Sequence, residues 1–545
     1  MTLKRALLES GYLPENMPPA FTSSKIADYL EKNAAKGTYL SDAKKPVRSS
    51  PYDASKRGMT RRTFSVVHPV TGSDLAEFCS SNWKDIENFY SNSAYSLSAP
   101  VHRPDGARAL DITSHSELER TRLARLSEFR FIAKTDISRF YHSIYTHSIP
   151  WAIHGKSASK IDRSPSSRKV PFNRVDYIFR CGQDGQTIGI PVGPDASRAI
   201  AELIATAIDV SFSKQHEAKH CAVLRHVDDV WIGANSHADV ETALWRYREC
   251  IREYELDINE SKTQIYSENF RFSDDWPSDI ASKLDGALDS KGRRAAERLR
   301  AALESAFSMT VAGNDDGVLK YTLRYLDQSK FRWDHWDSIE PFLKRASVHF
   351  GHTVDYVVRV IVWRHLTKGD LDIGSWKKIL EAILDRHGRL GNDSEVCWAI
   401  YACLRLSISI APGIADNIIR NCGALTIVAL LNCVAEGLVK KAAFETAAEL
   451  LSLESATGAY WPLMLEWVSR KWPSIENIQI DQQLIEGMAK SNVVIFEPQN
   501  LPVVFENIDE KQFNTVAEAI ERRISMYDDD EEDDDEPQDD DDDLF

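Results

Sequence analysis

Hydrophobic and polar positions follow two different patterns along the chain. As far as about residue 270, short apolar runs typical of strands alternate with segments in which apolar residues recur every three or four positions. Beyond about residue 278 the strand-like runs fade, and helix-like segments joined by short Gly or Pro turns dominate. The sequence therefore predicts an α+β region followed by an all-α region.

The α+β region offers candidates for individual elements. Helices are predicted in residues 1–35, 74–90, 114–130, 194–211 and 238–254. Strands are predicted at residues 63–69, 131–133, 175–180, 186–190, 222–224 and 230–232. The stretch 44–62, rich in Lys, Arg, Ser and Pro, is expected to be a flexible linker or a phosphate-binding arm, and 155–174 a surface loop.

In the all-α region the apolar periodicity defines a series of helices. They are predicted at residues 293–309, 320–326, 354–366, 376–386, 394–406, 414–422, 425–437, 441–451 and 458–472. Their density favours a HEAT-like α-solenoid, although a compact helical domain fits the composition nearly as well. Trp461, Trp467 and Trp472 could stack on bases, but aromatic residues in helix-like segments more often belong to the core.

Charge and cysteine content narrow the class of protein. The formal net charge is −16, but residues 528–545 contain 14 Asp and Glu, so the rest of the chain is nearly neutral. A basic channel would therefore require local clustering, and the acidic segment 526–545 is expected to be a disordered tail. The eight cysteines are scattered without a C-x-x-C pair, which argues against zinc and disulfides and for a reducing compartment. With no signal peptide and no apolar run of about 18 residues, a cytoplasmic protein without a membrane partner is expected.

Two apolar runs are interrupted by carboxylates. Asp228 and Asp229 lie between Ala222–Leu224 and Val230–Ile232, and Asp136 ends the run that begins at Phe131. An unpaired carboxylate in such a place costs several kcal/mol, which a divalent cation such as Mg²⁺ or Mn²⁺ would offset. Two ions about 4 Å apart would activate a 3′-hydroxyl and stabilise the leaving pyrophosphate. The chemistry predicted is nucleotidyl transfer.

An Asp-Asp pair at a hairpin is more often a turn signal than a metal site. Strand geometry also sends Asp228 and Asp229 to opposite sides, so the pair offers one well-aimed ligand and one weaker helper. The order of the surrounding segments favours the metal site. GIPVGPDAS at 189–197 lies between the two acidic stretches, and Leu256 to Thr263, reading LDINESKT, follows the second.

This ordered set resembles the palm motifs of reverse transcriptases. Asp136 stands in motif A, residues 189–197 in motif B, HVDD at 226–229 in motif C and residues 256–263 in motif D. Residues 143–156, SIYTHSIPWAIHGK, resemble the bacterial abortive-infection (Abi) and defence-associated reverse transcriptases, of the AbiK and AbiA kind. The resemblance implies a right-hand fingers-palm core followed by the helical region.

The domains implied are four. They are an N-terminal helical extension at 1–50, a fingers-palm reverse transcriptase domain at 51–270, a helical repeat-like domain at 271–525 and the acidic tail at 526–545.

The resemblance also implies roles for individual residues. Asp136, Asp228 and Asp229 would be the catalytic acids, and the carbonyl of Ile137 a further metal ligand. Lys262 would protonate the leaving pyrophosphate, although a helix-end Lys is as often a solvated charge. Tyr141 would be the gate that excludes a ribose 2′-hydroxyl, and Arg61 or Arg62 would bind the triphosphate. Gly193 and Ser197 are further expected nucleotide-binding residues. Candidates for a priming tyrosine are Tyr39, Tyr52 and Tyr527, which lie in stretches that look exposed.

Two positions depart from the usual motifs. Val192 stands where motif B usually has Gln, and His226 where motif C usually has Tyr or Phe. Both leave the metal chemistry intact and make conventional template copying less certain. The resemblance then implies untemplated or unconventionally templated, protein-primed DNA synthesis in antiphage defence.

The implied partners are dNTPs, the DNA product, a non-coding RNA template and further copies of the chain. Alternatives are a templated reverse transcriptase of a retroelement, a catalytically silent nucleic-acid-binding scaffold, and an RNA polymerase or terminal transferase on the same palm. The acidic tail is expected either to aid solubility or to occupy the nucleic-acid channel.

Overall fold

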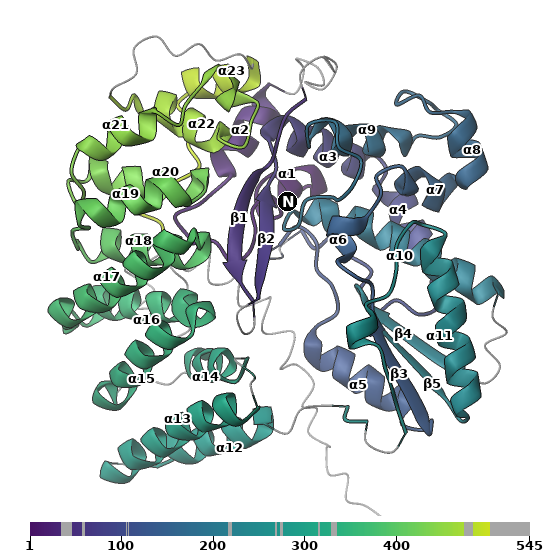
Figure 1. The fold of residues 1–545 in the computed structure, drawn as a ribbon, viewed down its shortest axis with the longest axis horizontal. Coiled ribbons are helices and arrows are strands. Elements are labelled where there is room, and N and C mark those ends of the chain that lie inside the picture. Colours follow the sequence, from purple (N-terminus) through teal and green to yellow (C-terminus); the bar gives the residue numbers. More distant parts are fainter. Residues whose placement is uncertain are drawn as a thin grey trace, which may run out of the picture.

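The fold is mixed, with a small antiparallel sheet on one side and a large array of helices on the other (Figure 1). The computed structural model describes residues 1–501 except 34–45, 57–59, 105, 107, 216–220, 268–269, 273–275, 291, 314, 316, 329–334 and 474–482. Among the described residues, no helix is long and apolar enough to cross a membrane.

The main sheet has four strands in the order β4-β5-β3-β6, all antiparallel. Its strands are β3 (Phe131–Asp136), β4 (Cys221–His226), β5 (Asp229–Ala234) and β6 (Gln264–Tyr266). The apolar runs on each side of the acidic positions form β3, β4 and β5, as predicted. Asp136 lies directly opposite Asp229, so the register brings the two acidic stretches together.

Alternation along the strands buries both faces of this sheet. Ala133, Val230 and Ile232 join the main core, where α11 (His237–Arg252) packs against β3 and β5. Trp231 and the other alternate positions face α5 (His115–Leu126) in a second, smaller cluster. The long helix α10 (Asp195–Gln215) packs on α11 and is buried along most of its length.

A separate two-stranded hairpin stands between the sheet and the helical array (Figure 1). Its strands β1 (Ser50–Ser55) and β2 (Arg61–Val66) begin within the stretch 44–62, so the expectation of a flexible linker is wrong there, whereas that of a phosphate-binding arm stays a prediction. The reason is an alternating pattern in which Ser50, Tyr52 and Ala54 are buried.

The remaining helices of the first half differ from the predictions in three places. They are α1 (Leu3–Leu8), α2 (Ser24–Lys32), α3 (Pro69–Ser81), α4 (Trp83–Tyr90), α6 (Phe140–Ser143), α7 (Ser148–His154), α8 (Lys156–Ile161) and α9 (Asn173–Cys181). The single helix predicted at 74–90 is two helices, and the predicted loop 155–174 contains α8. The strand predicted at 175–180 is the helix α9, because Val175, Ile178 and Phe179 are buried at helical spacing. Residues 186–190 form only an isolated bridge, between Ile188 and Tyr145.

Every helix predicted for the second half is present, with three that were not predicted. The helices are α12 (Trp276–Leu288), α13 (Arg293–Gly313), α14 (Gly317–Gln328), α15 (Trp336–His349), α16 (Val354–Thr367), α17 (Ile373–Leu390), α18 (Asp393–Arg405), α19 (Pro412–Asn421), α20 (Ala424–Ala435), α21 (Ala442–Ala448), α22 (Trp461–Arg470) and α23 (Gln483–Lys490). Those not predicted are α12, α15 and α23. Alternate helices pack together, as in α18 on α20 and α20 on α22, an arrangement compatible with stacked pairs.

Trp461 and Trp467 are buried in this helical core, and Trp472 nearly so, which favours the core interpretation over base stacking.

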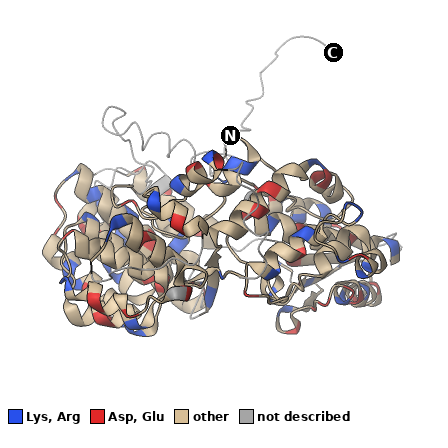
Figure 2. Cartoon of the chain, turned by 90° about the horizontal axis from the view of Figure 1, so that it is seen from above, with Lys and Arg blue, Asp and Glu red and all other residues tan. Residues whose placement is uncertain are grey.

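Charges of both signs are mixed along the part of the chain that Figure 2 shows. Lys and Arg are interspersed with Asp and Glu on both lobes in the view from above (Figure 2). This mixture agrees with the near neutrality of the chain outside its acidic tail.

Candidate active site

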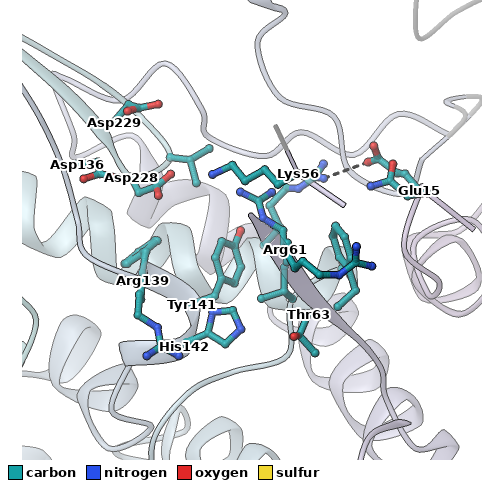
Figure 3. Close-up of a pocket in the computed structure, with 18 of the residues that line it drawn as sticks. Glu15, Lys56, Arg61, Thr63, Asp136, Arg139, Tyr141, His142, Asp228 and Asp229 are labelled. Carbon is teal, nitrogen blue, oxygen red and sulfur yellow. Dashed lines mark hydrogen bonds and ion pairs between the residues drawn. The ribbon is translucent and has the colours of Figure 1, made fainter. Parts of the chain in front are cut away.

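A cleft of about 700 Å³ opens where the end of the main sheet, the β1–β2 hairpin, the loop before α10 and the N-terminal segment meet. Its charged lining residues are Glu15, Lys56, Arg61, Arg62, Asp136, Arg139, Arg198, Asp228, Asp229 and Lys262. Figure 3 shows the three Asp side chains together on one side, with Lys56 across from them and Tyr141 between. The cleft therefore has a carboxylate side and a cationic side.

The carboxylate side is built from the ends of paired strands. Asp136 is the last residue of β3, Asp229 is the first of β5, and Asp228 lies in the turn between β4 and β5. The backbone N–H of Ile137 donates to the carbonyl of Asp228 at 3.0 Å, and the N–H of Asn259 donates to the carbonyl of Asp136 at 2.8 Å. The first bond joins the end of β3 to the turn that carries Asp228, and the second joins it to the segment that leads to Lys262.

The turn that presents Asp228 has a strained backbone. Val227 has φ 57°, a left-handed conformation that is rare for a β-branched residue and costs about 1–3 kcal/mol. Its N–H donates to Ser98 Oγ at 2.7 Å, and its carbonyl accepts from Arg225 Nη1 at 3.1 Å. The guanidinium of Arg225 is fully buried against Glu202 and Asp209. This network holds the turn, and no sequence motif pointed to it.

The electrostatics of the acids suit a cation. Burial raises the pKa of Asp228, and the neighbouring charge of Asp229 raises it further. Oδ2 of Asp136 accepts from Lys262, and this hydrogen bond raises the pKa of the lysine. Oδ1 of Asp136 is buried and has no hydrogen-bond partner. A divalent ion would use the free acceptor of Asp136 Oδ1. It would also offset the cost of ionising the Asp228 carboxyl in a buried environment.

These acids form an open rather than a closed set of ligands. No group of three or more His, Cys, Asp or Glu side chains that could hold a metal ion occurs among the described residues. Mg²⁺ commonly binds to one or two carboxylates and completes its shell with water and substrate phosphates. Asp136 and Asp228 could supply those carboxylates, and the carbonyl of Ile137 and Asp229 lie beside them.

On the cationic side, Arg61 and Arg62 have different surroundings. The guanidinium of Arg61 pairs with Asp53 and with Glu395 of α18. Arg62, on the opposite face of the strand, is exposed and lines the cleft. Burial and the neighbouring charge of Arg62 lower the pKa of Lys56. The negative charges of Asp228 and Asp136 partly offset this shift, so Lys56 interacts electrostatically with both acids. Arg62 and Lys56 are therefore better placed than Arg61 to meet an anionic ligand.

The other predicted nucleotide-binding residues divide into two groups. Tyr141 lies on α6 and extends into the cleft, where burial raises its pKa to about 12 (Figure 3). Gly193 lines the cleft with φ 121°, and a Cβ atom there would come within 2.9 Å of Pro14. Ser197 is fully buried in α10 and does not line the cleft, which contradicts its expected contact with a nucleotide. The next residue, Arg198, lines the cleft instead.

The structure describes only one of the three predicted priming tyrosines. Tyr52 is fully buried in β1, so the expectation that it is exposed is wrong. Side chains alternate between the two faces of β1, and Tyr52 lies on the face that is buried. Tyr39 and Tyr527 lie outside the described residues.

Two further lining residues come from the N-terminal segment. Glu15 pairs with Arg198 at 3.2 Å, and Asn16 accepts a hydrogen bond on its carbonyl from Trp398 Nε1 at 2.9 Å. Glu15 and Asn16 lie in the connection between α1 and α2. The helices predicted within residues 1–35 therefore did not indicate these contacts.

Comparison with known proteins identifies part of the chain. Residues 76–273 match the family model of reverse transcriptase (RNA-dependent DNA polymerase). No curated protein matches the sequence.

Solved structures that resemble the chain include telomerases from two Candida species. Apo telomerase from Candida tropicalis, truncated from its C-terminal domain, is 13% identical with a TM-score of 0.28, over 45% of this chain and 55% of that one. The chain therefore spans little more than half the length of that relative. Telomerase from Candida albicans in complex with a TWJ fragment of telomeric RNA is 12% identical with a TM-score of 0.28, over 65% of this chain and 67% of that one. Apo telomerase from Candida tropicalis is 10% identical with a TM-score of 0.32, over 78% and 70%.

The matched segment contains the three acids and Lys262, whereas the β1–β2 hairpin precedes it. Residues 76–273 are therefore similar to a reverse transcriptase domain.

Proposed function

We propose that the cleft is the active site of a reverse-transcriptase-type DNA polymerase that joins dNTPs to a 3′-hydroxyl by two-metal nucleotidyl transfer. The observation that carries the proposal is the meeting, in one cleft, of Asp136, Asp228 and Asp229 of the matched domain with a facing set of cations. The unused, buried Oδ1 of Asp136 supports it further.

Mg²⁺ or Mn²⁺ would be held by Asp136, Asp228 and the carbonyl of Ile137, with Asp229 beside them. When bound, the ions supply activation of the 3′-hydroxyl and charge neutralisation on the leaving pyrophosphate. The chain's own residues do the rest. The buried carboxylate of Asp136 orients the ligand shell, and the strained turn at Val227 carries Asp228, which lines the cleft.

The cations of the cleft bind the triphosphate and carry a proton. Arg62, Lys56 and Arg198 face the open space where phosphates would lie. Lys262 is protonated at neutral pH, as lysines ordinarily are, and its hydrogen bond to Asp136 raises its pKa further. It is therefore protonated when the pyrophosphate leaves and can donate to it.

Tyr141 acts on the sugar. Its pKa of about 12 keeps the phenol neutral at physiological pH, so the ring presents an uncharged wall to the nucleotide. A side chain of this size beside the 2′ position admits dNTPs and excludes rNTPs.

The biological setting is proposed from the sequence. The likeness of residues 143–156 to the Abi and defence-associated enzymes supports a role in antiphage defence. Val192 in motif B and His226 in motif C support untemplated or unconventionally templated synthesis, with Tyr39 or Tyr527 as priming hydroxyls. An associated RNA, assembly with further copies and a cytoplasmic location complete the proposal, the last resting on eight free cysteines.

The experiment is a labelling assay. Purified protein is incubated with Mg²⁺ and each labelled dNTP singly, without nucleic acid or with a primed RNA template, beside an Asp228→Ala/Asp229→Ala variant. Label in the wild type alone supports the polymerase, and label that shifts on proteolysis supports protein priming. Label that requires the primed RNA would indicate templated reverse transcription. Absence of label under every condition would contradict the proposal.

A further inference from the structure

The β1–β2 hairpin carries two of the cations that face the catalytic acids. Lys56 follows β1 directly and Arg62 lies in β2, and both line the cleft. The hairpin precedes the reverse transcriptase domain in sequence and packs against α18 and α20 of the helical array. Its position over the cleft therefore depends on residues outside the matched domain.

Helix α18 holds the strand β2 through a buried carboxylate. Glu395 is 1% exposed and accepts two hydrogen bonds from Arg61, at 2.8 Å from Nη1 and 2.9 Å from Nη2. This is the two-point geometry in which a guanidinium and a carboxylate fit best. Arg61 also pairs with Asp53 in the neighbouring strand, so the contact spans both strands and the helix.

A second carboxylate in the same helical turn holds β1. Asp393 accepts from the backbone N–H of Asp53 at 3.2 Å, from Gly423 N–H at 2.8 Å and from Thr426 Oγ1 at 2.6 Å. The contacts from Asp53 and Arg61 to α18 join residues separated by 340 and 334 positions in sequence. The first turn of α18 thus binds both strands, with Tyr52 and Ala54 buried beneath them.

We propose that Glu395 is a positioning residue of the nucleotide site. By fixing Arg61 it fixes β2, and so places Arg62 and Lys56 against the triphosphate across from the catalytic acids. The helical array is then a structural component of the nucleotide site. This inference rests on the proposed function, because it takes the ligand of the cleft to be a nucleotide.

The arrangement separates two roles for neighbouring arginines. Arg61 is an anchor whose guanidinium is bound to Glu395 and Asp53, whereas Arg62 is exposed and lines the cleft. If Arg61 itself gripped the triphosphate, Glu395 would compete with the substrate for it. Loss of the Glu395 charge would then strengthen nucleotide binding, whereas in the anchoring role it weakens binding.

The test compares Glu395→Gln with a matched control, Glu466→Gln. Glu466 is also fully buried in the helical array and paired with an arginine, Arg470, but its other contacts are to the backbone at Ile495 and Phe496. In labelled dNTP incorporation, Glu395→Gln is expected to raise KM for the dNTP about tenfold with a smaller change in kcat. Glu466→Gln should leave KM unchanged even where it lowers thermal stability. An unchanged or lower KM in Glu395→Gln would overturn the proposal.

A double variant checks that the effect passes through Arg61. Glu395→Gln added to Arg61→Ala should raise KM no further than Arg61→Ala alone, because both remove the same contact. Independent, multiplying effects would contradict the anchoring role. Should Glu395→Gln fail to fold, Arg61→Lys takes its place, since it keeps the charge and loses the paired geometry.

A readout that needs no activity separates this inference from the proposed function. Hydrogen exchange of the described amides in residues 50–66 should quicken in Glu395→Gln and stay at the wild-type rate in Glu466→Gln. Faster exchange together with a wild type that incorporates no dNTP would uphold the anchor and reject the polymerase. Unchanged exchange would reject the anchor whatever the activity.

Discussion

The two sides of the cleft are held by different kinds of contact. On the carboxylate side, Asp136 and Asp229 face each other across a paired β-ladder, and the turn at Val227 is bound by Ser98 and Arg225. On the cationic side, the hairpin is bound by Glu395 and Asp393, which belong to a helix more than 300 residues away in sequence. The three acids therefore depend on the domain that contains them, whereas the cations of the hairpin depend on the helical array. Variants that affect one side and spare the other can test this division.

The largest effect is expected from the acids. Asp136→Asn keeps the size of the side chain but removes the charge that would hold a divalent ion, so dNTP incorporation should fall about 10³-fold. Asp162→Asn, at a carboxylate on the surface beyond α8, should keep full activity. Substantial activity in Asp136→Asn, measured at saturating dNTP, would show that the chemistry lies elsewhere.

The next effect concerns the turn that carries Asp228. Arg225→Met would leave Glu202 and Asp209 buried without their cation, which should lower the free energy of unfolding by about 3 kcal/mol. Arg246→Met, which breaks an exposed pair with Glu249, should cost less than about 1 kcal/mol. Urea denaturation of the two variants compares these costs, and equal costs would mean that the buried network does not stabilise the turn.

A smaller, pH-dependent effect is expected where the end of the hairpin meets the helical array. His68 follows β2, is fully buried, and lies with Nε2 3.0 Å from the carbonyl of Ala456. Burial lowers its pKa from 6.5 to about 4. The unfolded chain then binds a proton that the folded chain does not, so stability is lost as pH falls from about 6.5 towards 4.

The loss attributable to His68 should reach about 2 kcal/mol at pH 5. His68→Gln should reduce the slope of melting temperature against pH between 7 and 5, and His349→Gln, at an exposed position, should not. If the two variants retained the wild-type slope alike, another group would be responsible for it.

Sequence patterns were sufficient to predict which acids meet on the carboxylate side of the cleft, and the reason is physical. Each acid ends or begins an apolar run that must pair with its neighbour, so local alternation already places Asp136 near Asp228 and Asp229. The cationic side carries no comparable pattern. The strand β1 contains Pro51 and lies in a stretch whose composition indicates a linker, and it is stabilised by packing on α18.

Other differences have the same origin in tertiary packing. Residues 175–180 are apolar at both strand and helix spacing, and burial against neighbouring helices selected the helix. One position in α10 decides that Arg198 rather than Ser197 reaches the cleft, because each step along a helix turns the side chain by about 100°. The contact of Glu15 with Arg198 depends on the path of the chain between two helices, which apolar periodicity does not encode.

The division between the two sides is tested most directly by the neighbouring arginines of β2. Labelled dNTP incorporation over a range of dNTP concentrations, with thermal denaturation of the same samples, would compare Arg61→Ala with Arg62→Ala. Arg62→Ala is expected to raise KM about tenfold at unchanged melting temperature, because it removes a cation from the cleft alone. Arg61→Ala is expected to raise KM and to lower the melting temperature, because it leaves Glu395 buried without its partner. An unchanged KM in Arg62→Ala, or an unchanged melting temperature in Arg61→Ala, would contradict the account.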